Sequence, residues 1–254
     1  MKETWRLIHD PPLPGKENMA RDLEIHRQVA RGEAPPTLRF YTWDPPALSL
    51  GRFQRPEEVA SLPACRDLGI HVVQRPTGGR ALLHDRELTY SLAVPEGHPT
   101  IPSSVLGAYR AISAGLVRGL ALLGIPAELA PGDKRGRPLA PGACFDTPSA
   151  YELQVKGKKV VGSAQMRRGG GLLQHGSVLL SLPLDLYRRV LLPPPGEGED
   201  FLQSLAEGAA GLDDLGYRVT LEDLRAALQA GFLESLGLEF IPEKEDANPW
   251  NNIP

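Results

Sequence analysis

The chain has 254 residues, of which 41% are hydrophobic and 23% are charged, and its formal net charge is -3. A chain of this length and composition can bury one sizeable core, which favours a single globular domain over a disordered or membrane-spanning protein. The slight acidic excess argues against a general nucleic-acid binder, because phosphate contacts require surplus positive charge. We therefore expect one domain over residues 1–254, with no nucleic-acid partner.

The cysteines and the N-terminal residues bear on the cellular compartment. Cys65 and Cys144 lie far apart without CxxC spacing, so neither a disulfide framework nor a zinc site is expected. The N-terminus has no basic start followed by an apolar run, and no later stretch approaches eighteen uninterrupted apolar residues. We expect a cytoplasmic protein with free thiols, no metal site and no membrane partner.

The first half of the chain predicts a helix, several short strands and a second helix. Helical spacing of apolar residues covers 18–31, and Pro35 ends that helix. Short β-rich pieces bounded mostly by Pro, Gly or Asp follow at 37–41, 47–50, 70–74, 81–83 and 88–94. The second helix spans 103–123, and Ser103 or Ser104 can cap its start.

The second half predicts a hairpin, a further strand and three helices. A Gly- and Pro-rich loop over 131–143 leads to Cys144, and Lys156-Gly157 is a two-residue hairpin turn. The expected strands are 150–155, 158–165 and 172–182, and the expected helices are 185–192, 199–207 and 221–236, the last capped by Thr220. This pattern predicts an α+β or mixed α/β domain, with a mixed sheet flanked by helices.

The first unusual segment is RPTGGR, residues 75–80, between two predicted strands. Adjacent glycines let backbone N–H groups converge on a ligand, and the two arginines can supply positive charge for a carboxylate, a phosphate or a polarised carbonyl. A plain Gly-Gly hairpin with exposed arginines would have the same sequence. The segment lacks the GxxxxGK[ST] spacing of a Walker loop.

Two further segments contain reactive side chains. Cys144 ends the Gly- and Pro-rich loop and precedes small polar residues, unlike a structural cysteine within an apolar strand. Lys159 lies near the start of a predicted strand whose later residues have small side chains. A lysine at this position can hold a carbonyl oxygen or favour a neighbouring thiolate. Alternation places Lys158 on the opposite face, where we expect it to be solvated.

Other polar side chains have ordinary structural explanations. His84 and His175 lie close to these segments, and each could be a satisfied structural histidine. Asp146 and Glu152 could be ordinary loop or surface carboxylates. Basic residues that could dock an acidic carrier protein, or be simply solvated, are Lys134, Arg135, Arg137, Arg167 and Arg168.

Four segments together resemble the lipoate-protein ligase and octanoyltransferase family. They are RPTGGRALLHDRELTYS (75–91), CFDTPSAYEL (144–153), GKKVVGSAQ (157–165) and LQHGS (173–177), and Asn18-Met19-Ala20 also looks like the family. The resemblance implies the catalytic domain shared by biotin and lipoate ligases, here over about 35–240, followed by a C-terminal tail at 241–254.

Within this family, the CFDTPS segment resembles octanoyltransferases that form an acyl-thioester enzyme, which implies that Cys144 accepts the acyl group. The resemblance casts Lys159 as the group that promotes the thiolate and orients the acyl carbonyl. We expect further substrate contacts from Arg75, Thr77, Gly78, Gly79, Arg80, His84, Gly162, Ser163, Ala164, His175 and Gly176. If the Lys156-Gly157 hairpin continued in register, Cys144 would lie far from Lys159, so the chain after Cys144 must fold back.

The implied reaction moves octanoyl from octanoyl-acyl carrier protein to Cys144 and then to a lysine of a lipoyl domain, such as glycine cleavage H protein, with no cofactor. An ATP-dependent lipoate-protein ligase, which would require ATP and Mg²⁺, is one alternative. A second is an amidotransferase that moves octanoyl or lipoyl groups between lipoyl carriers. A third is a non-catalytic module that binds lipoyl domains or acyl chains.

Overall fold

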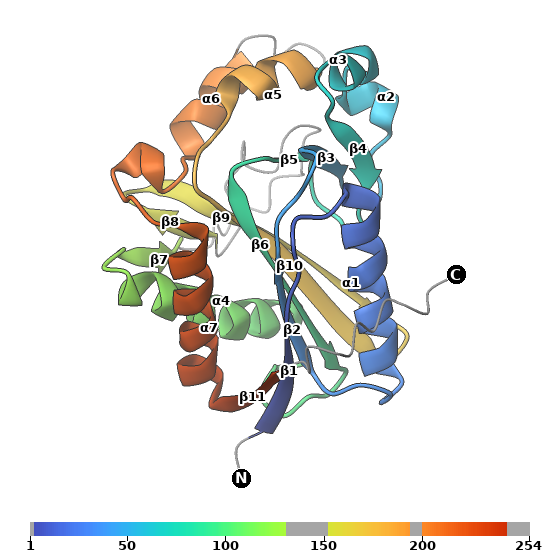
Figure 1. Cartoon of the computed structure of the whole chain (residues 1–254), viewed down its shortest axis with the longest axis vertical. Coiled ribbons are helices and arrows are strands. Elements are labelled where there is room, and N and C mark those ends of the chain that lie inside the picture. The colour runs from blue at the N-terminus through green and yellow to red at the C-terminus, as the bar shows by residue number, and fades with distance from the viewer. Residues whose placement is uncertain (1–2, 131–151, 194–199, 243–254) are drawn as a thin grey trace.

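The computed structural model describes residues 3–130, 152–193 and 200–242 (Figure 1). An eight-stranded sheet runs through the molecule in the order β11-β1-β2-β6-β10-β9-β8-β7, and a separate three-stranded sheet has the order β4-β3-β5. The strands of the large sheet are β1 Glu3–His9, β2 Thr37–Tyr41, β6 Glu87–Pro95, β7 Ala127–Leu129, β8 Leu153–Val155, β9 Lys158–Arg168, β10 Gly171–Leu179 and β11 Leu238–Pro242. Those of the small sheet are β3 Ala47–Leu50, β4 His71–Gln74 and β5 Leu82–His84.

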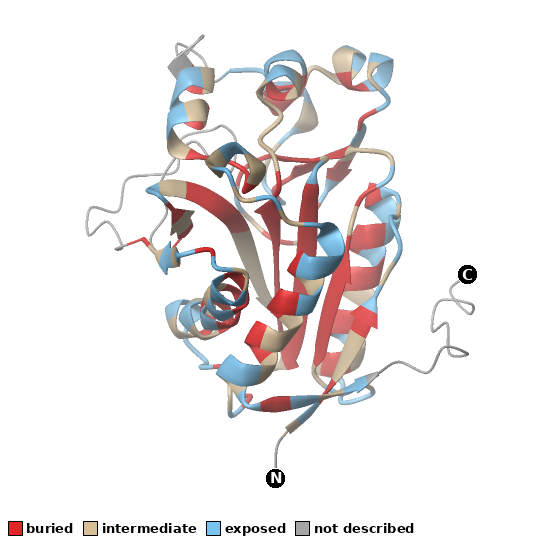
Figure 2. Ribbon diagram, turned by 60° about the vertical axis from the view of Figure 1, so that its left-hand side comes forward, coloured by how far each residue is buried: buried red, intermediate tan, exposed pale blue. Residues whose placement is uncertain are grey.

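The large sheet is mixed, as predicted. Strand β1 pairs in parallel with both β2 and β11, whereas the other described pairings in this sheet are antiparallel. The central strands are buried on both faces, since every residue of β2 and β10 is buried (Figure 2). Strands covered on both faces are rich in apolar and small residues, and the buried polar side chains of Arg39, Gln174 and His175 are hydrogen-bonded instead.

Helices cover both faces of the large sheet (Figure 1). One face packs against α1, Gly15–Ala30, around a small apolar cluster that includes Ile25, Val29 and Leu173. The other face carries the main core and is covered by α4, Val105–Leu122, and α7, Leu221–Leu236. Side chains of alternating residues on the central strands therefore enter two different cores.

Helix α4 is long and apolar enough to cross a membrane by length and composition alone. In the folded chain its apolar residues Ile112, Leu116 and Leu120 are buried in the core. Gly115 and Gly119 let α7 approach closely, because a Cβ on Gly115 would lie 2.5 Å from the Phe232 ring. The apolar composition of α4 is thus explained by its place between the sheet and α7.

The small sheet has its own apolar cluster, built with four short helices. These are α2 Pro56–Val59, α3 Leu62–Asp67, α5 Leu184–Val190 and α6 Asp200–Gly208. Cys65 is a buried member of this cluster, where it packs as a small apolar side chain. This half of the molecule positions β3, β5 and the RPTGGR segment against the α1 face of the large sheet.

Several predicted boundaries are confirmed by specific contacts. The Lys156-Gly157 turn has two positive φ values, 52° and 75°, as a tight hairpin requires. The Ser104 side chain accepts a hydrogen bond from the Gly107 backbone N–H, and Thr220 caps α7 in the same way through Asp223. Lys158 is half-buried rather than fully solvated, because its Nζ donates to the Ala206 carbonyl at 2.7 Å.

The structure also contains strands that the sequence did not predict. Strand β1 begins well before residue 35 and joins the sheet between β2 and β11, and β11 continues beyond Phe240. The described part of the 150–155 strand is limited to β8, whose pairing with β9 shifts register between Leu153 and Gln154. The β8 strand therefore follows β9 only as far as Val161.

Candidate active site

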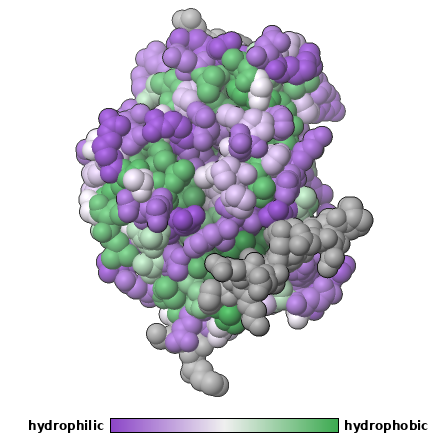
Figure 3. Space-filling view, viewed as in Figure 1, coloured by the Kyte–Doolittle hydropathy of each residue, from purple (hydrophilic) through white to green (hydrophobic). Residues whose placement is uncertain are grey.

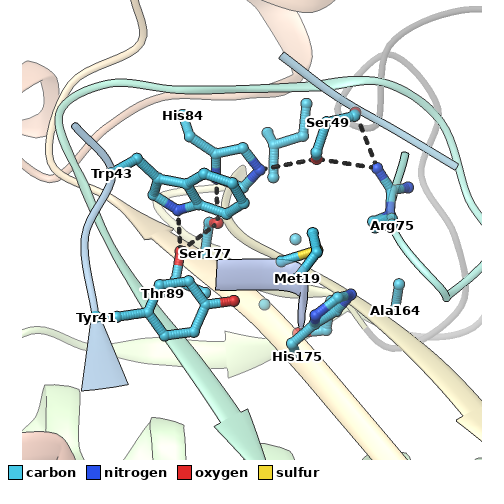
Figure 4. Close-up of a pocket in the computed structure, with 14 residues that line it drawn as sticks. Met19, Tyr41, Trp43, Ser49, Arg75, His84, Thr89, Ala164, His175 and Ser177 are labelled. Carbon is cyan, nitrogen blue, oxygen red and sulfur yellow. Dashed lines mark hydrogen bonds between the residues drawn. The ribbon is translucent and has the colours of Figure 1, made fainter. Parts of the chain in front are cut away.

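A cavity lies between the α1 face of the large sheet and the small sheet (Figure 4). It contains roughly 340 Å³ of empty space, part of which opens to solvent. The lining residues are Met19, Tyr41, Trp43, Ser49, Arg75, Leu82, His84, Thr89, Gly162, Ser163, Ala164, His175, Gly176 and Ser177. They come from both sheets and α1, so the cavity exists only in the assembled fold.

The RPTGGR segment is held in shape mainly by the side chain of its first residue. The Arg75 guanidinium is buried and donates to the backbone carbonyl oxygens of Ser49, Gly78 and Arg80, at 3.0, 2.9 and 2.7 Å. Arg75 also donates to the Ser49 hydroxyl at 3.2 Å. Arg75 therefore fixes the loop through these contacts. Its positive charge stays at the wall of the cavity.

The glycines of this segment allow a close approach of two backbones. Gly79 has a φ of 91°, and a Cβ on Gly51 would lie only 1.8 Å from the Gly79 carbonyl oxygen. Any larger residue at Gly51 would therefore push the loop away. Gly78, Gly79 and Arg80 belong to the loop but are not among the cavity-lining residues.

His175 is fixed at the cavity by partners from two other segments. Its Nδ1 donates to the Asp22 carboxylate at 2.9 Å, and its Nε2 lies 2.7 Å from the Thr77 hydroxyl. The donor assignment follows because an ionised carboxylate can only accept. Thr77 does not itself line the cavity, so it acts by connecting the RPTGGR loop to His175.

Asp22 lies at the centre of a buried polar network. Its carboxylate accepts hydrogen bonds from Arg39 at 2.7 Å and from the Tyr41 hydroxyl at 2.9 Å. Burial alone would raise the pKa of Asp22, but the charge of Arg39 and the contact with His175 outweigh burial and lower it. Asp22 therefore remains an anion that orients the histidine ring.

His84 and Trp43 form one wall of the cavity (Figure 4). Their rings stack with centroids 3.8 Å apart, and the Trp43 indole N–H donates to the Thr89 hydroxyl at 2.8 Å. His84 Nε2 lies 2.8 Å from the Ser49 hydroxyl, while burial lowers the pKa of His84 despite the Glu87 carboxylate 3.5 Å away. The ring nitrogens of Trp43 and His84 already have polar partners, so apolar ring surface is left for a substrate.

The opposite wall is a run of small residues on β9 and β10. Gly162, Ser163 and Ala164 line the cavity, and a Cβ on Gly176 would lie 2.4 Å from Ser163 Oγ. The Ser163 hydroxyl is held 2.8 Å from the Tyr90 hydroxyl. Small side chains at these positions allow a ligand to lie directly against the strand backbone.

Lys159 lies on the same strand, three residues before Gly162, but does not line the cavity. It is 3% exposed and forms an ion pair with Glu152, which is equally buried. The expectation that Glu152 is an ordinary surface carboxylate is therefore wrong. The contact is not visible in the sequence, because it joins Glu152, directly before β8, to Lys159 on β9 across the hairpin.

Cys144 lies outside the described residues, as do Asp146 and the basic loop residues Lys134, Arg135 and Arg137. The distance from Cys144 to Lys159 thus stays a prediction. Seven predicted contact residues do line the cavity: Arg75, His84, Gly162, Ser163, Ala164, His175 and Gly176. Among the residues that the structure describes, no cluster of His, Cys, Asp and Glu could hold a metal ion.

Sequence reasoning did not identify several residues that build the site. Tyr41, Trp43, Ser49 and Thr89 line the cavity, and Asp22 orients His175 from α1. Asp22 is an acidic residue within the apolar face of a predicted helix, since it is fully buried between Asn18 and Ile25. A charged residue inside an otherwise buried helix face was the signal that could have found it.

The sequence model of the lipoyl protein ligase A/B catalytic domain matches residues 14–233. The chain belongs to this family. It is 48% identical over 246 residues to "Octanoyltransferase LipM" of Kyrpidia tusciae and 46% identical over 248 residues to the protein of the same name from Symbiobacterium thermophilum. These alignments cover 94% and 95% of this chain and 90% of each relative.

Solved structures of the family confirm the fold. The chain superposes on a lipoate-protein ligase A bound with ATP with a TM-score of 0.75 and 28% identity, covering 96% of this chain and 90% of that one. It also matches a bipartite lipoate protein ligase from Thermoplasma acidophilum, solved with its E2 lipoyl domain, with a TM-score of 0.74, 26% identity, and coverage of 96% and 88%. The predicted lipoate ligase-like catalytic fold is therefore correct.

Proposed function

We propose that this chain is an octanoyltransferase of protein lipoylation, which takes an octanoyl group from octanoyl-acyl carrier protein and passes it to a lysine of a lipoyl domain. The observation that carries the proposal is an apolar-walled cavity beside the strand that bears Lys159, in a chain 48% identical to an octanoyltransferase. Such a cavity suits an unbranched acyl chain. The proposed acceptors include glycine cleavage H protein and other lipoyl domains.

The proposed reaction has two steps that share one thioester. The Cys144 thiolate attacks the octanoyl carbonyl carbon, and the carrier thiolate leaves and takes up a proton. The neutral amine of the acceptor lysine then attacks the enzyme thioester, loses its proton, and displaces the Cys144 thiolate. The product is an octanoyl amide, and neither step consumes ATP or requires a metal ion.

In this scheme Lys159 supplies positive charge that favours the Cys144 thiolate and orients the acyl carbonyl. The buried ion pair with Glu152 supports this role, because the carboxylate restrains the long lysine side chain in the protein interior. Gly162 and Ala164 leave room for the acyl chain against β9. A reduced Cys144 is required, which fits the reducing cytoplasm that we propose as the compartment.

Three parallel reactions test the proposal. The purified chain and a lipoyl domain are mixed with octanoyl-acyl carrier protein, with octanoate plus ATP and Mg²⁺, or with a second, octanoylated lipoyl domain, and the acceptor is followed by intact-mass spectrometry. We expect octanoyl addition at the highest rate from the acyl carrier protein. Product only with ATP would indicate a ligase, and product only from the octanoylated domain would indicate an amidotransferase.

A further inference from the structure

A second, larger groove adjoins the cavity and shares Arg75 with it. The groove contains about 1210 Å³ of empty space, including open solvent, between α1, the end of β4 and the β9–β10 turn. It is lined by Leu23, His26, Arg27, Ala30, Arg31, Arg52, Gln74, Arg75, Pro76, Met166, Arg168 and Gly169. Five of these lining residues are arginines and none is acidic, so the groove is strongly cationic.

The exposed arginines of this groove have few competing partners. Arg27 pairs with Glu24 at 3.3 Å and Arg31 with Glu33 at 3.9 Å, both as exposed pairs. Such pairs contribute little and are readily exchanged for another anion. Arg52 and Arg168 make no ion pair with any residue that the structure describes.

An exposed aromatic side chain stands next to this charge. Phe53 is 86% exposed, and the Arg52 guanidinium lies 5.7 Å from the centre of its ring. Where grey atoms do not cover this side of the molecule, most of the visible surface is hydrophilic (Figure 3). A lone exposed aromatic beside arginines is a typical composition for a protein-binding surface.

We propose that the groove docks the donor, an acyl carrier protein, by binding the phosphodiester of its phosphopantetheine arm and adjacent acidic residues. The inference rests on the proposed function. Arginines suit a phosphodiester because their planar N–H forks match its oxygens. From the groove the arm passes Arg75 toward the cavity, which brings the thioester to the acyl site.

The positive charge of the groove makes it unsuitable for the part of the lipoyl domain that carries the acceptor lysine. The lipoyl domain must present a lysine amine, and the surrounding arginines would repel its protonated form. A donor with an anionic arm gains from those arginines instead. The positive charge of the groove thus favours binding of the donor over binding of the acceptor, and we assign the groove to the donor.

The test combines Arg52→Glu with Arg168→Glu and compares it with Arg66→Glu combined with Arg189→Glu. The control makes the same change in charge on exposed residues of α3 and α5, outside the groove. For each protein, acyl-enzyme formation is measured with octanoyl-acyl carrier protein and with octanoyl-pantetheine, which lacks both the phosphate and the carrier. Transfer to the lipoyl domain is measured separately from preformed acyl-enzyme.

We expect the groove variant to lose about tenfold in kcat/KM for the carrier substrate at low salt, and less at high salt, with octanoyl-pantetheine changed less than about twofold. Equal kinetics of groove and control variants would overturn the docking site. Slower transfer to the lipoyl domain, with donor loading unchanged, would assign the groove to the acceptor and overturn the proposal. If the wild-type chain takes no octanoyl from the carrier, the proposed function itself fails.

Folding of the variants is checked by circular dichroism. If the first groove variant fails to fold, Arg27→Glu combined with Arg31→Glu provides a second test at the exposed C-terminal end of α1. This pair is expected to give the same selective loss with the carrier substrate. A folded second variant with wild-type kinetics would overturn the proposal.

Discussion

The ion pair between Lys159 and Glu152 shows how a single residue can be misjudged from its sequence neighbours. Lys159 stands out because small residues follow it, whereas Glu152 alternates with apolar residues in a predicted strand and so resembles a surface carboxylate. Both are buried in the fold because β8 and β9 pair as a hairpin with a register shift. A buried lysine without its carboxylate would carry an uncompensated charge, so the two positions depend on each other.

We predict that Glu152→Gln lowers the free energy of unfolding by about 3 kcal/mol, because it removes one partner of a buried ion pair. Urea unfolding followed by circular dichroism measures the change. The matched control is Glu58→Gln, which removes an exposed partner of Arg55 and should change stability by less than about 1 kcal/mol. Equal effects of the two variants would contradict a buried, mutually dependent pair.

Asp22 gives a prediction on pH dependence. Although burial acts to raise the pKa of Asp22, Arg39 and His175 lower it below its ordinary value, so the ionised form stabilises the folded chain. This stability is present above the unfolded pKa of about 4 and is lost as pH falls through the lower folded pKa. We expect Asp22→Asn to be less stable near neutral pH and to show a shallower loss of stability in acid.

Unfolding free energies between about pH 7 and about pH 2 test this expectation. Asp185→Asn is the control, since the Asp185 side chain is 98% exposed. The control should keep the acid dependence of the wild-type chain. An Asp22→Asn variant with the same acid dependence as wild type would show that Asp22 does not contribute in this way.

At the scale of elements, a testable prediction follows from the close contact between the RPTGGR loop and Gly51, the residue directly after β3. Gly51→Ala places a Cβ 1.8 Å from the Gly79 carbonyl oxygen, so the loop must shift. We expect a loss of at least about 2 kcal/mol in the free energy of unfolding. Gly78→Ala is the matched control, because a Cβ there meets nothing within 4 Å and should cost less than about 1 kcal/mol. A tolerated Gly51→Ala would contradict this loop geometry.

Elements with local signals were predictable from the sequence. The Lys156-Gly157 turn and the Thr220 cap depend on adjacent residues, and the structure confirms both. Strand β1 has no such signal, because its residues Glu3–His9 mix charged and apolar side chains without strict alternation. It becomes a strand only because β2 and β11 pair with it on either side.

At the scale of the whole molecule, the cavity could not be predicted because its walls are brought together from distant parts of the chain. Met19 comes from α1, Trp43 and Leu82 from the region of the small sheet, and Ala164 from β9. Sequence motifs covered its loop, its small-residue strand and Met19, but not Tyr41 and Trp43. Those residues have no motif, since their role arises from tertiary packing alone.

We predict that Ala164→Leu narrows the cavity and shortens the acyl group that it accepts. Acyl-enzyme formation from an octanoyl donor should fall about tenfold or more, while formation from a butanoyl donor should change much less. Single-turnover mass spectrometry with both donors measures the ratio. Parallel losses with the two chain lengths would show that this cavity does not hold the acyl chain.

The central claim is that Cys144 carries the acyl group. Intact-mass spectrometry of the chain after mixing with octanoyl-acyl carrier protein tests it directly, with Cys144→Ser and Cys65→Ser as matched single-thiol variants, because Cys65 is buried in the small-sheet cluster. We expect one added octanoyl group, labile to hydroxylamine, on the wild-type and Cys65→Ser chains and none on Cys144→Ser. An octanoyl adduct that persists in Cys144→Ser and is lost in Cys65→Ser would contradict the account.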